Sequence, residues 1–396
     1  MKKLFQLKNL CTLIFLVLLL LFFLLGFKAL GRTVLYGLRT IGIGGTLNPA
    51  NLESHYLDRM STRFEPLITL NGGVERLLGK RYVNDRYRLD CGNLVYTIPE
   101  LDMSENAART IAFRDTLREQ GIPFVYVNAP FSIDTENKQL PPGIEDYGNE
   151  NADRFLQLLR QADVDVVDLR ELEKADGLDH YENYCRTDHH WRPEMGLWAA
   201  GKIQQSLGEM YPDFASDPAL CASENYTVEI RENSFLGSNG RRVGPWYAGY
   251  DDMSILHPQF ETALEVHFSR DESTRRGDLE QCLYFPEVFD EKDPFQASQY
   301  NFYCGGDEAM HIRNLAGEQG LPVQDNGKKV LLIKDSCSLV VIPYLSLCFS
   351  EMRTYDMRIE DASLDAVIEA FQPDLVMVLY NPGALEDNNW NMFYFS

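Results

Sequence analysis

The chain has 396 residues, of which 45% are hydrophobic and 12% aromatic, and its formal charge at pH 7 is −22. This composition supports a packed core and excludes a disordered chain. The acidic balance argues against nucleic-acid binding, because phosphate backbones would repel the protein.

An uncharged, apolar run from Leu10 to Phe27 follows three lysines near the N-terminus. It is long enough to cross a bilayer core and longer than the apolar region of most secretory signals, which spans about 7–15 residues. Because the lysines precede it, the positive-inside rule places the N-terminus in the cytoplasm. We expect a cytoplasmic tail over 1–9 and a retained cell-membrane anchor over 10–30. A weak cleavage site at Ala29-Leu30-Gly31 leaves a cleaved signal as the alternative.

The remainder is expected to divide into a stalk and irregular lead-in over 31–100 and a catalytic domain over 101–396. The periodicity predicts a helix from Ser104 to about Gly121. The apolar run 122–129 predicts a strand that is buried on both faces, as in a parallel sheet. A second helix and strand follow, the strand over 164–169, and Pro193 opens another helix.

Regular periodicity weakens over about 212–328, which is rich in Gly, Asn, Asp, Tyr and Pro, and this stretch is expected to be a long insertion. A buried strand, 330–333, then leads to Lys334-Asp335-Ser336. A helix that contains Leu364 and Phe371 and a strand over 375–380 come later, and Asn381 directly follows that strand. Strands that alternate with helices predict an α/β fold of three layers around a parallel sheet.

Polar side chains follow several of these strands. Ser336 follows one strand and Asn381 another, and Asp188 and His190 lie beyond a third. Because sites in open α/β sheets gather at the carboxyl ends of the strands, these side chains are expected to meet. In the predicted triad the Ser336 hydroxyl attacks an ester carbonyl, His190 takes its proton and Asp188 orients the imidazole. The Ser336 backbone N–H and the Asn381 side chain are the candidate oxyanion donors.

The run Asp188-His189-His190-Trp191 resembles the signature of the DHHW protein family. That family is similar to the periplasmic alginate O-acetyltransferases, whose motif is Asp-x-His-Trp, and both resemble the SGNH hydrolase superfamily. The resemblance covers roughly residues 100–210 and 328–385. It implies a circularly permuted SGNH-like fold, because the acid and base precede the serine strand. Two features depart from ordinary SGNH hydrolases: the serine block reads Lys-Asp-Ser instead of Gly-Asp-Ser, and the acid and base are two positions apart instead of three.

Further site residues are candidates only. Gly305 and Gly306 are candidates for the superfamily's oxyanion glycine, and Trp191, His189 and Arg358 are candidates for substrate binding. Trp191, Asn381 and Ser336 also have structural interpretations. A tryptophan is more often a core residue than a sugar platform, an asparagine before Pro-Gly is a natural turn residue, and a strand that ends in Asp-Ser is often a plain turn.

The resemblance implies an extracytoplasmic O-acetyltransferase that acts on exopolysaccharide or cell-wall glycan, for which a membrane-bound O-acyltransferase can supply the acyl group. A carbohydrate O-acetyl esterase uses the same acyl-enzyme and remains an alternative. Two other classes stay open. One is a non-catalytic glycan-binding subunit of an acetylation complex. The other is a metal-dependent phosphoesterase, since Asp-His-His also marks a manganese-dependent family, and it would need further ligands such as Asp168, Asp179 and His180. The favoured reading needs neither a metal nor a cofactor.

Overall fold

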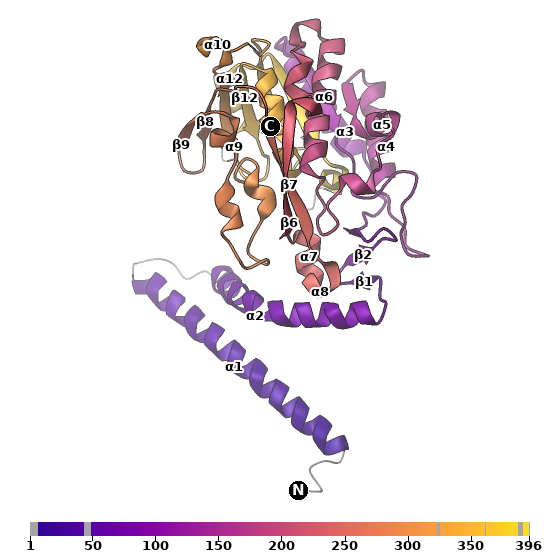
Figure 1. The fold of residues 1–396 in the computed structure, drawn as a ribbon, viewed down its shortest axis with the longest axis vertical. Helices are drawn as coiled ribbons and strands as arrows, with labels where there is room; N and C mark the ends of the chain where they lie inside the picture. The colour runs from indigo at the N-terminus through magenta and orange to yellow at the C-terminus, as the bar shows by residue number, and fades with distance from the viewer. Residues whose placement is uncertain (1–6, 43–48, 323–324, 361, 387–390, 396) are drawn as a thin grey trace.

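The computed structural model describes residues 7–42, 49–322, 325–360, 362–386 and 391–395, and an eight-stranded sheet lies at its centre (Figure 1). Five strands of the sheet are parallel to one another, in the spatial order β5-β4-β13-β11-β12. Their bounds are Phe124–Asn128 (β4), Asp165–Asp168 (β5), Lys329–Lys334 (β11), Glu351–Tyr355 (β12) and Leu375–Tyr380 (β13). Counted from β11, the order is 2-1-3-4-5, as in doubly wound sheets.

The sheet is mixed, which corrects the expectation of a parallel sheet. Beyond β12 it continues through three antiparallel strands, β10 (Met310–Asn314), β8 (Leu264–Phe268) and β9 (Ser273–Gly277). All three come from the expected insertion. Only four residues separate β8 from β9, and so short a connection can join antiparallel strands but leaves no room for the crossover that a parallel pair needs.

Helices cover both faces of the sheet, so the core has three layers. One face packs against α3 (Ser104–Glu119), α4 (Gly148–Gln161) and α12 (Leu364–Phe371). The other face packs against α6 (Pro193–Met210) and α11 (Ile342–Leu345). Side chains alternate between the two faces along each parallel strand, and in β11 Leu331 and Leu332 belong to opposite clusters. Burial on both faces accounts for the nearly continuous apolar sequence of these strands.

The rest of the expected insertion forms a long antiparallel pair, β6 and β7, together with short helices. The remaining elements have these bounds: α5 (Leu169–Ala175), β6 (Tyr226–Phe235), α7 (Ser238–Val243), α8 (Pro245–Ala248), β7 (Asp251–Pro258), α9 (Leu279–Leu283) and α10 (Ala316–Gln319).

Residues before α3 form two long helices and a small sheet. The helix α1 (Leu7–Gly42) extends away from the α/β body, and α2 (Pro49–Leu77) lies beside α7 and α8 (Figure 1). Strands β1 (Tyr82–Val83), β2 (Arg86–Arg88) and β3 (Leu94–Val95) form an antiparallel sheet next to α7.

Within the described part of the chain, the structure contains no helix with the length and apolar character that crossing a membrane requires. The anchor expected over 10–30 falls in α1 and is therefore not confirmed. Residues 1–6, most of the expected cytoplasmic tail, lie outside the described residues.

Candidate active site

The predicted nucleophile begins a short helical turn at the carboxyl end of β11. Ser336 is the first residue of the 3-10 helix Ser336–Val340, and Asp335 is its N-cap. One Asp335 carboxylate oxygen accepts the Cys337 N–H at 2.9 Å, and the other accepts the Asn381 N–H at 2.7 Å. A single side chain therefore shapes the serine turn and joins it to the end of β13. The carboxyl ends of the neighbouring strands β11 and β13 form the switch point at which ligands bind in doubly wound sheets.

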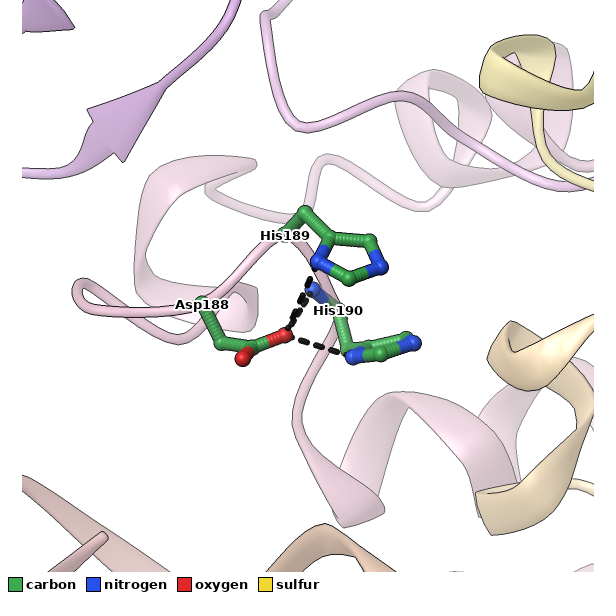
Figure 2. Close-up of side chains that lie close together, drawn as sticks. All are labelled: Asp188, His189 and His190. Carbon is green, nitrogen blue, oxygen red and sulfur yellow. Dashed lines mark hydrogen bonds and ion pairs between the residues drawn. The ribbon is translucent and has the colours of Figure 1, made fainter. Parts of the chain in front are cut away.

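The three predicted triad residues meet in the structure. The Ser336 Oγ lies 2.8 Å from His190 Nε2, and His190 Nδ1 lies 2.5 Å from Asp188 Oδ1. Both distances fall within hydrogen-bonding range. The carboxylate of Asp188 lies beside both imidazoles (Figure 2). Burial disfavours ionisation of Asp188, but the two imidazoles and the Ser238 backbone N–H outweigh it and hold the pKa of this carboxyl well below its usual range.

The second oxygen of Asp188 is held by the start of α7. The Ser238 N–H donates to Asp188 Oδ2 at 2.5 Å, and the Gly240 N–H donates to the Thr187 carbonyl at 2.7 Å. A side chain at position 237 has no space here, because a Cβ on Gly237 would lie 2.3 Å from the Cβ of Asp188. The segment Gly237-Ser238-Asn239-Gly240, which the sequence indicated only as part of an irregular insertion, therefore fixes the acid of the triad.

The imidazole of His190 lies close to two other rings. Tyr300 stacks on one side, with centroids 4.2 Å apart and planes at 15°, and the ring of His189 lies 3.9 Å away. Tyr300 comes from the expected insertion and is buried. No motif pointed to it, and only the folded arrangement shows that its ring packs against the imidazole of His190.

Trp191 holds the two halves of the site together. It is 1% exposed, and its indole Nε1–H donates to the Cys337 carbonyl at 2.8 Å. A side chain so buried offers no ring face to a substrate, so its position favours the structural interpretation of Trp191 over the substrate-binding one. Burial also raises the pKa of the neighbouring Cys337 thiol well above its usual value, so the thiol stays protonated and is a poor nucleophile.

His189 lines the pocket that contains Ser336 and also contacts the acid of the triad. Its Nδ1 lies 2.9 Å from the Ser238 hydroxyl and 3.3 Å from Asp188 Oδ1. Burial and the neighbouring His190 lower the pKa of His189 to about 4, although Asp188 opposes the change. His189 is therefore neutral near pH 7, and it is placed to contact a substrate.

Arg358 also lines the pocket, where two carboxylates hold it. Its guanidinium pairs with Asp356 at 2.6 Å and with Asp307 at 3.0 Å. The same two carboxylates pair with Lys334, whose side chain is fully buried, at 2.9 and 2.7 Å. The lysine of the Lys-Asp-Ser block is therefore part of a network of two cations and two anions, in which Lys334 and Asp356 are fully buried and Arg358 and Asp307 are partly exposed.

The oxyanion candidates differ in position. Asn381 lines the pocket, but its side-chain N–H donates to the Pro130 carbonyl at 2.6 Å, which leaves one amide hydrogen for a substrate. Neither Gly305 nor Gly306 is among the described residues that line the pocket. Both have positive φ, and they lead the chain to Asp307. The prediction that one of them faces the oxyanion is therefore not supported by their position.

The pocket has a volume of about 580 Å³, and part of its wall comes from the expected lead-in. The segment 82–97 contributes aromatic and charged side chains to it. The signal for this segment in the sequence was Asn84-Asp85 between two short runs of β-forming residues, a pattern typical of a hairpin. The described residues that line the pocket are Tyr82, Asp85, Arg86, Tyr87, Tyr96, Thr97, His189, Asp335, Ser336, Cys337, Arg358, Asn381, Gly383, Ala384, Glu386 and Met392.

Among the described residues, one group of side chains has the spacing of metal ligands: Asp188, His189 and His190, whose ligand atoms lie within 4.8 Å of one another. The additional ligands that a phosphoesterase would need do not join this group. Asp168 pairs with Arg170, and His180 lies beside Glu173. The site supports a charge relay to Ser336 more directly than a metal centre.

Part of the chain is similar in sequence to an acetyltransferase family. Residues 95–229 match the family described as SGNH hydrolase-like domain, acetyltransferase AlgX. No curated protein matches the sequence at a significant level.

Solved structures extend this likeness over most of the chain. PatB1 of Bacillus cereus aligns with 74% of this chain and 92% of its own, at 21% identity and a TM-score of 0.60. The same protein with a sulfonyl adduct aligns with 80% and 99%, at 18% identity and a TM-score of 0.63. A DHHW family protein from Eubacterium siraeum aligns with 79% and 96%, at 17% identity and a TM-score of 0.59. The resemblance to a DHHW family protein is confirmed for the fold, which is SGNH-like, and the resemblance to an SGNH hydrolase-like acetyltransferase domain is confirmed for residues 95–229.

Proposed function

We propose that this protein is a serine acyl-ester enzyme that transfers an O-acetyl group to a glycan on the extracytoplasmic side of the cell membrane. The observation that carries the proposal is the 2.8 Å contact between Ser336 Oγ and His190 Nε2, with His190 Nδ1 bonded to a carboxylate. Ser336 lines the pocket, and in the proposed relay it is the nucleophile, His190 is the base and Asp188 is the orienting acid. The match to an acetyltransferase family supports the choice of acyl group.

In the first half of the proposed reaction, Ser336 Oγ attacks the carbonyl carbon of an acetyl ester while His190 Nε2 takes its proton. Asp188, held ionised by its neighbours, stabilises the resulting imidazolium. The tetrahedral intermediate collapses, the ester C–O bond breaks, and the leaving alcohol takes the proton from His190. The backbone N–H of Ser336 and the free amide hydrogen of Asn381 are the proposed oxyanion donors, each worth about 3–4 kcal/mol in the transition state.

In the second half, a sugar hydroxyl attacks the acetyl-serine and gives its proton to His190. The bond to Ser336 Oγ breaks, and the serine regains a proton from the imidazole. Water in place of the sugar gives an esterase through the same steps. A membrane-bound O-acyltransferase is the proposed source of the acetyl group, and the apolar run 10–27 after three lysines supports the location.

The test measures acetate release from a chromogenic acetyl ester by the full chain, with and without neutral sugars as acceptors. Ser336→Ala is expected to abolish turnover. With the parent chain, added sugar is expected to yield acetylated sugar in place of free acetate. Ser338→Ala is the matched control, because its hydroxyl is buried and contacts the Leu379 carbonyl instead of His190.

Each result has one meaning. Turnover that depends on Ser336 but never yields acetylated sugar indicates an esterase. A sulfonyl fluoride should label Ser336 and leave Ser338 unlabelled, in line with the sulfonyl adduct of the similar Bacillus cereus PatB1. Absence of both turnover and labelling would overturn the proposal and favour a glycan-binding subunit. Turnover of a phosphoester that a chelator abolishes would favour the metal enzyme.

Protease protection of the N-terminus in sealed membranes tests the proposed location of the protein.

A further inference from the structure

A small hairpin places an aromatic pair at the mouth of the pocket that contains Ser336. Strands β1 and β2 are joined by Asn84 and Asp85, with φ of 47° and 60°, which is typical of a two-residue hairpin turn with both residues left-handed. Tyr82 and Tyr87 are paired across the strands, and their ring centroids lie 4.8 Å apart. Both rings line the pocket, and Tyr82 is 50% exposed. This pair therefore presents apolar ring surface to whatever enters.

The hairpin is fixed to the segment that holds the catalytic acid. Asn84 donates from its side chain to the Arg242 carbonyl at 2.8 Å, and Arg86 Nε donates to Asn239 Oδ1 at 2.5 Å. Asn239 follows Ser238, whose N–H binds Asp188. The aromatic pair is therefore held at a set position relative to the triad, as a binding surface for the reacting partner must be.

The charges around the pair favour an uncharged ligand. The guanidinium of Arg358 is paired with Asp356 and Asp307. Arg86 adds a positive charge, because the oxygens of Asn239 and of the Asp85 carbonyl to which it donates are uncharged. The carboxyl groups of the lining, those of Asp85, Asp335 and Glu386, outnumber it. Carboxylates accept hydrogen bonds from hydroxyl groups and repel anionic sugars. Aromatic faces attract the C–H faces of sugar rings, because the ring face is electron-rich and sheds water readily.

We infer that the β1–β2 hairpin is the acceptor subsite, and that the acceptor is a neutral glycan whose sugar ring packs on Tyr82 and Tyr87 while Asp85 accepts hydrogen bonds from its hydroxyls. This inference rests on the proposed function for the identity of the reaction. It adds that the lead-in segment, outside the α/β body, selects the sugar. A ring held on this pair presents a hydroxyl toward the acetyl-serine in the same pocket.

The experiment measures binding in the Ser336→Ala protein, in which turnover cannot obscure it. The full chain is titrated by calorimetry with cellopentaose and chitopentaose as neutral probes and with a pentagalacturonate as the anionic probe. Neutral glycan is expected to bind more tightly than the anionic one. Tyr82→Ala combined with Tyr87→Ala should weaken neutral binding by roughly tenfold or more, given the usual energies of aromatic contacts.

Two further variants keep the test decisive. Tyr394→Ala removes a tyrosine that is 46% exposed but is not among the described pocket residues, so it should bind as tightly as the parent. Asp85→Asn keeps the turn, because asparagine tolerates left-handed φ, and should weaken binding by removing a carboxylate even if the double alanine variant folds poorly.

The outcomes separate this inference from the proposed function. Unchanged binding in both the double alanine and Asp85→Asn variants, or no binding of either neutral probe by the parent, overturns the subsite, whatever the ester assay shows. Hairpin-dependent binding in a chain that shows no Ser336-dependent ester turnover leaves the subsite standing and removes the catalytic proposal. Tighter binding of the pentagalacturonate would overturn the neutral acceptor.

Discussion

Trp191 donates its indole N–H to the carbonyl oxygen of Cys337 at 2.8 Å, across 146 positions of the chain. These two residues directly follow His190 and Ser336, whose side chains meet at the same distance. The buried indole bond therefore lies beside the contact between Ser336 and His190 and holds the two backbone segments at a set separation. The geometry that the predicted relay needs thus depends on a buried residue outside the relay itself.

Trp191→Phe should lower kcat with little change in KM. Phenylalanine fills much of the same space, but the buried Cys337 carbonyl loses its donor, at a cost of about 1–3 kcal/mol in stability. The serine turn is then less firmly placed against His190. Steady-state kinetics with a chromogenic acetyl ester and a thermal melt check this. Trp198→Phe is the matched control, because it removes an indole bond to Asp176, also 2.8 Å long, on the outer side of α6. Equal losses of activity in both variants would contradict the role given to Trp191.

Asp188→Asn should lower kcat on the order of 10³–10⁴-fold while the protein stays folded, a loss typical of triads whose acid is replaced by its amide. The amide can still accept the Ser238 N–H but cannot stabilise an imidazolium. Acetyl ester turnover with circular dichroism is the measurement. Asp252→Asn changes another carboxylate that accepts a backbone N–H, that of Asn233 at 2.7 Å, and should leave turnover intact. A loss of less than tenfold in Asp188→Asn would show that the relay does not operate.

His189 should make the protein less stable as the pH falls from about 6.5 to about 4. Its pKa is lowered to about 4 in the folded state, against 6.5 ordinarily, so the unfolded chain binds a proton that the folded chain does not. Stability is therefore lost on going down through this window, by at most about 1.4 kcal/mol per pH unit for this one proton. Urea unfolding at several pH values compares the parent with His189→Asn, which should have a smaller slope. Identical slopes would show that His189 titrates at its ordinary value.

Lys334→Met should destabilise the fold by about 3–5 kcal/mol, because it removes the buried cation beside the fully buried Asp356 and leaves Asp356 and the partly exposed Asp307 to share Arg358. Adding Asp307→Asn removes one of these charges and should restore part of the loss. Denaturant unfolding of the two single variants and the double variant closes this cycle. Strictly additive losses would contradict a shared network. Lys328→Met, on a half-buried lysine just before β11, is the control and should cost little.

The sequence predicted the elements of the body well where burial leaves a local pattern. The strand at 330–333 and the helix containing Leu364 and Phe371 both appear in the structure. They could be predicted because the spacing of apolar residues along the sequence records which faces of a helix or strand are buried. The mixed sheet was missed, since the pairing of β8, β9 and β10 with β12 depends on contacts between distant segments that periodicity does not record.

By itself, the sequence determined the chemical types in the site: an acid and base two positions apart and a serine after a buried strand, which specify a relay once they meet. Only the tertiary structure decided that they do meet and that the buried Trp191 bonds the two backbone segments together. It also placed Gly305 and Gly306 outside the pocket lining, just before Asp307 of the charge network, and it brought Tyr300 and the segment 82–97 to the site. The reason is physical: a side chain's chemistry is local, but its burial, orientation and partners are set by segments far away in the chain.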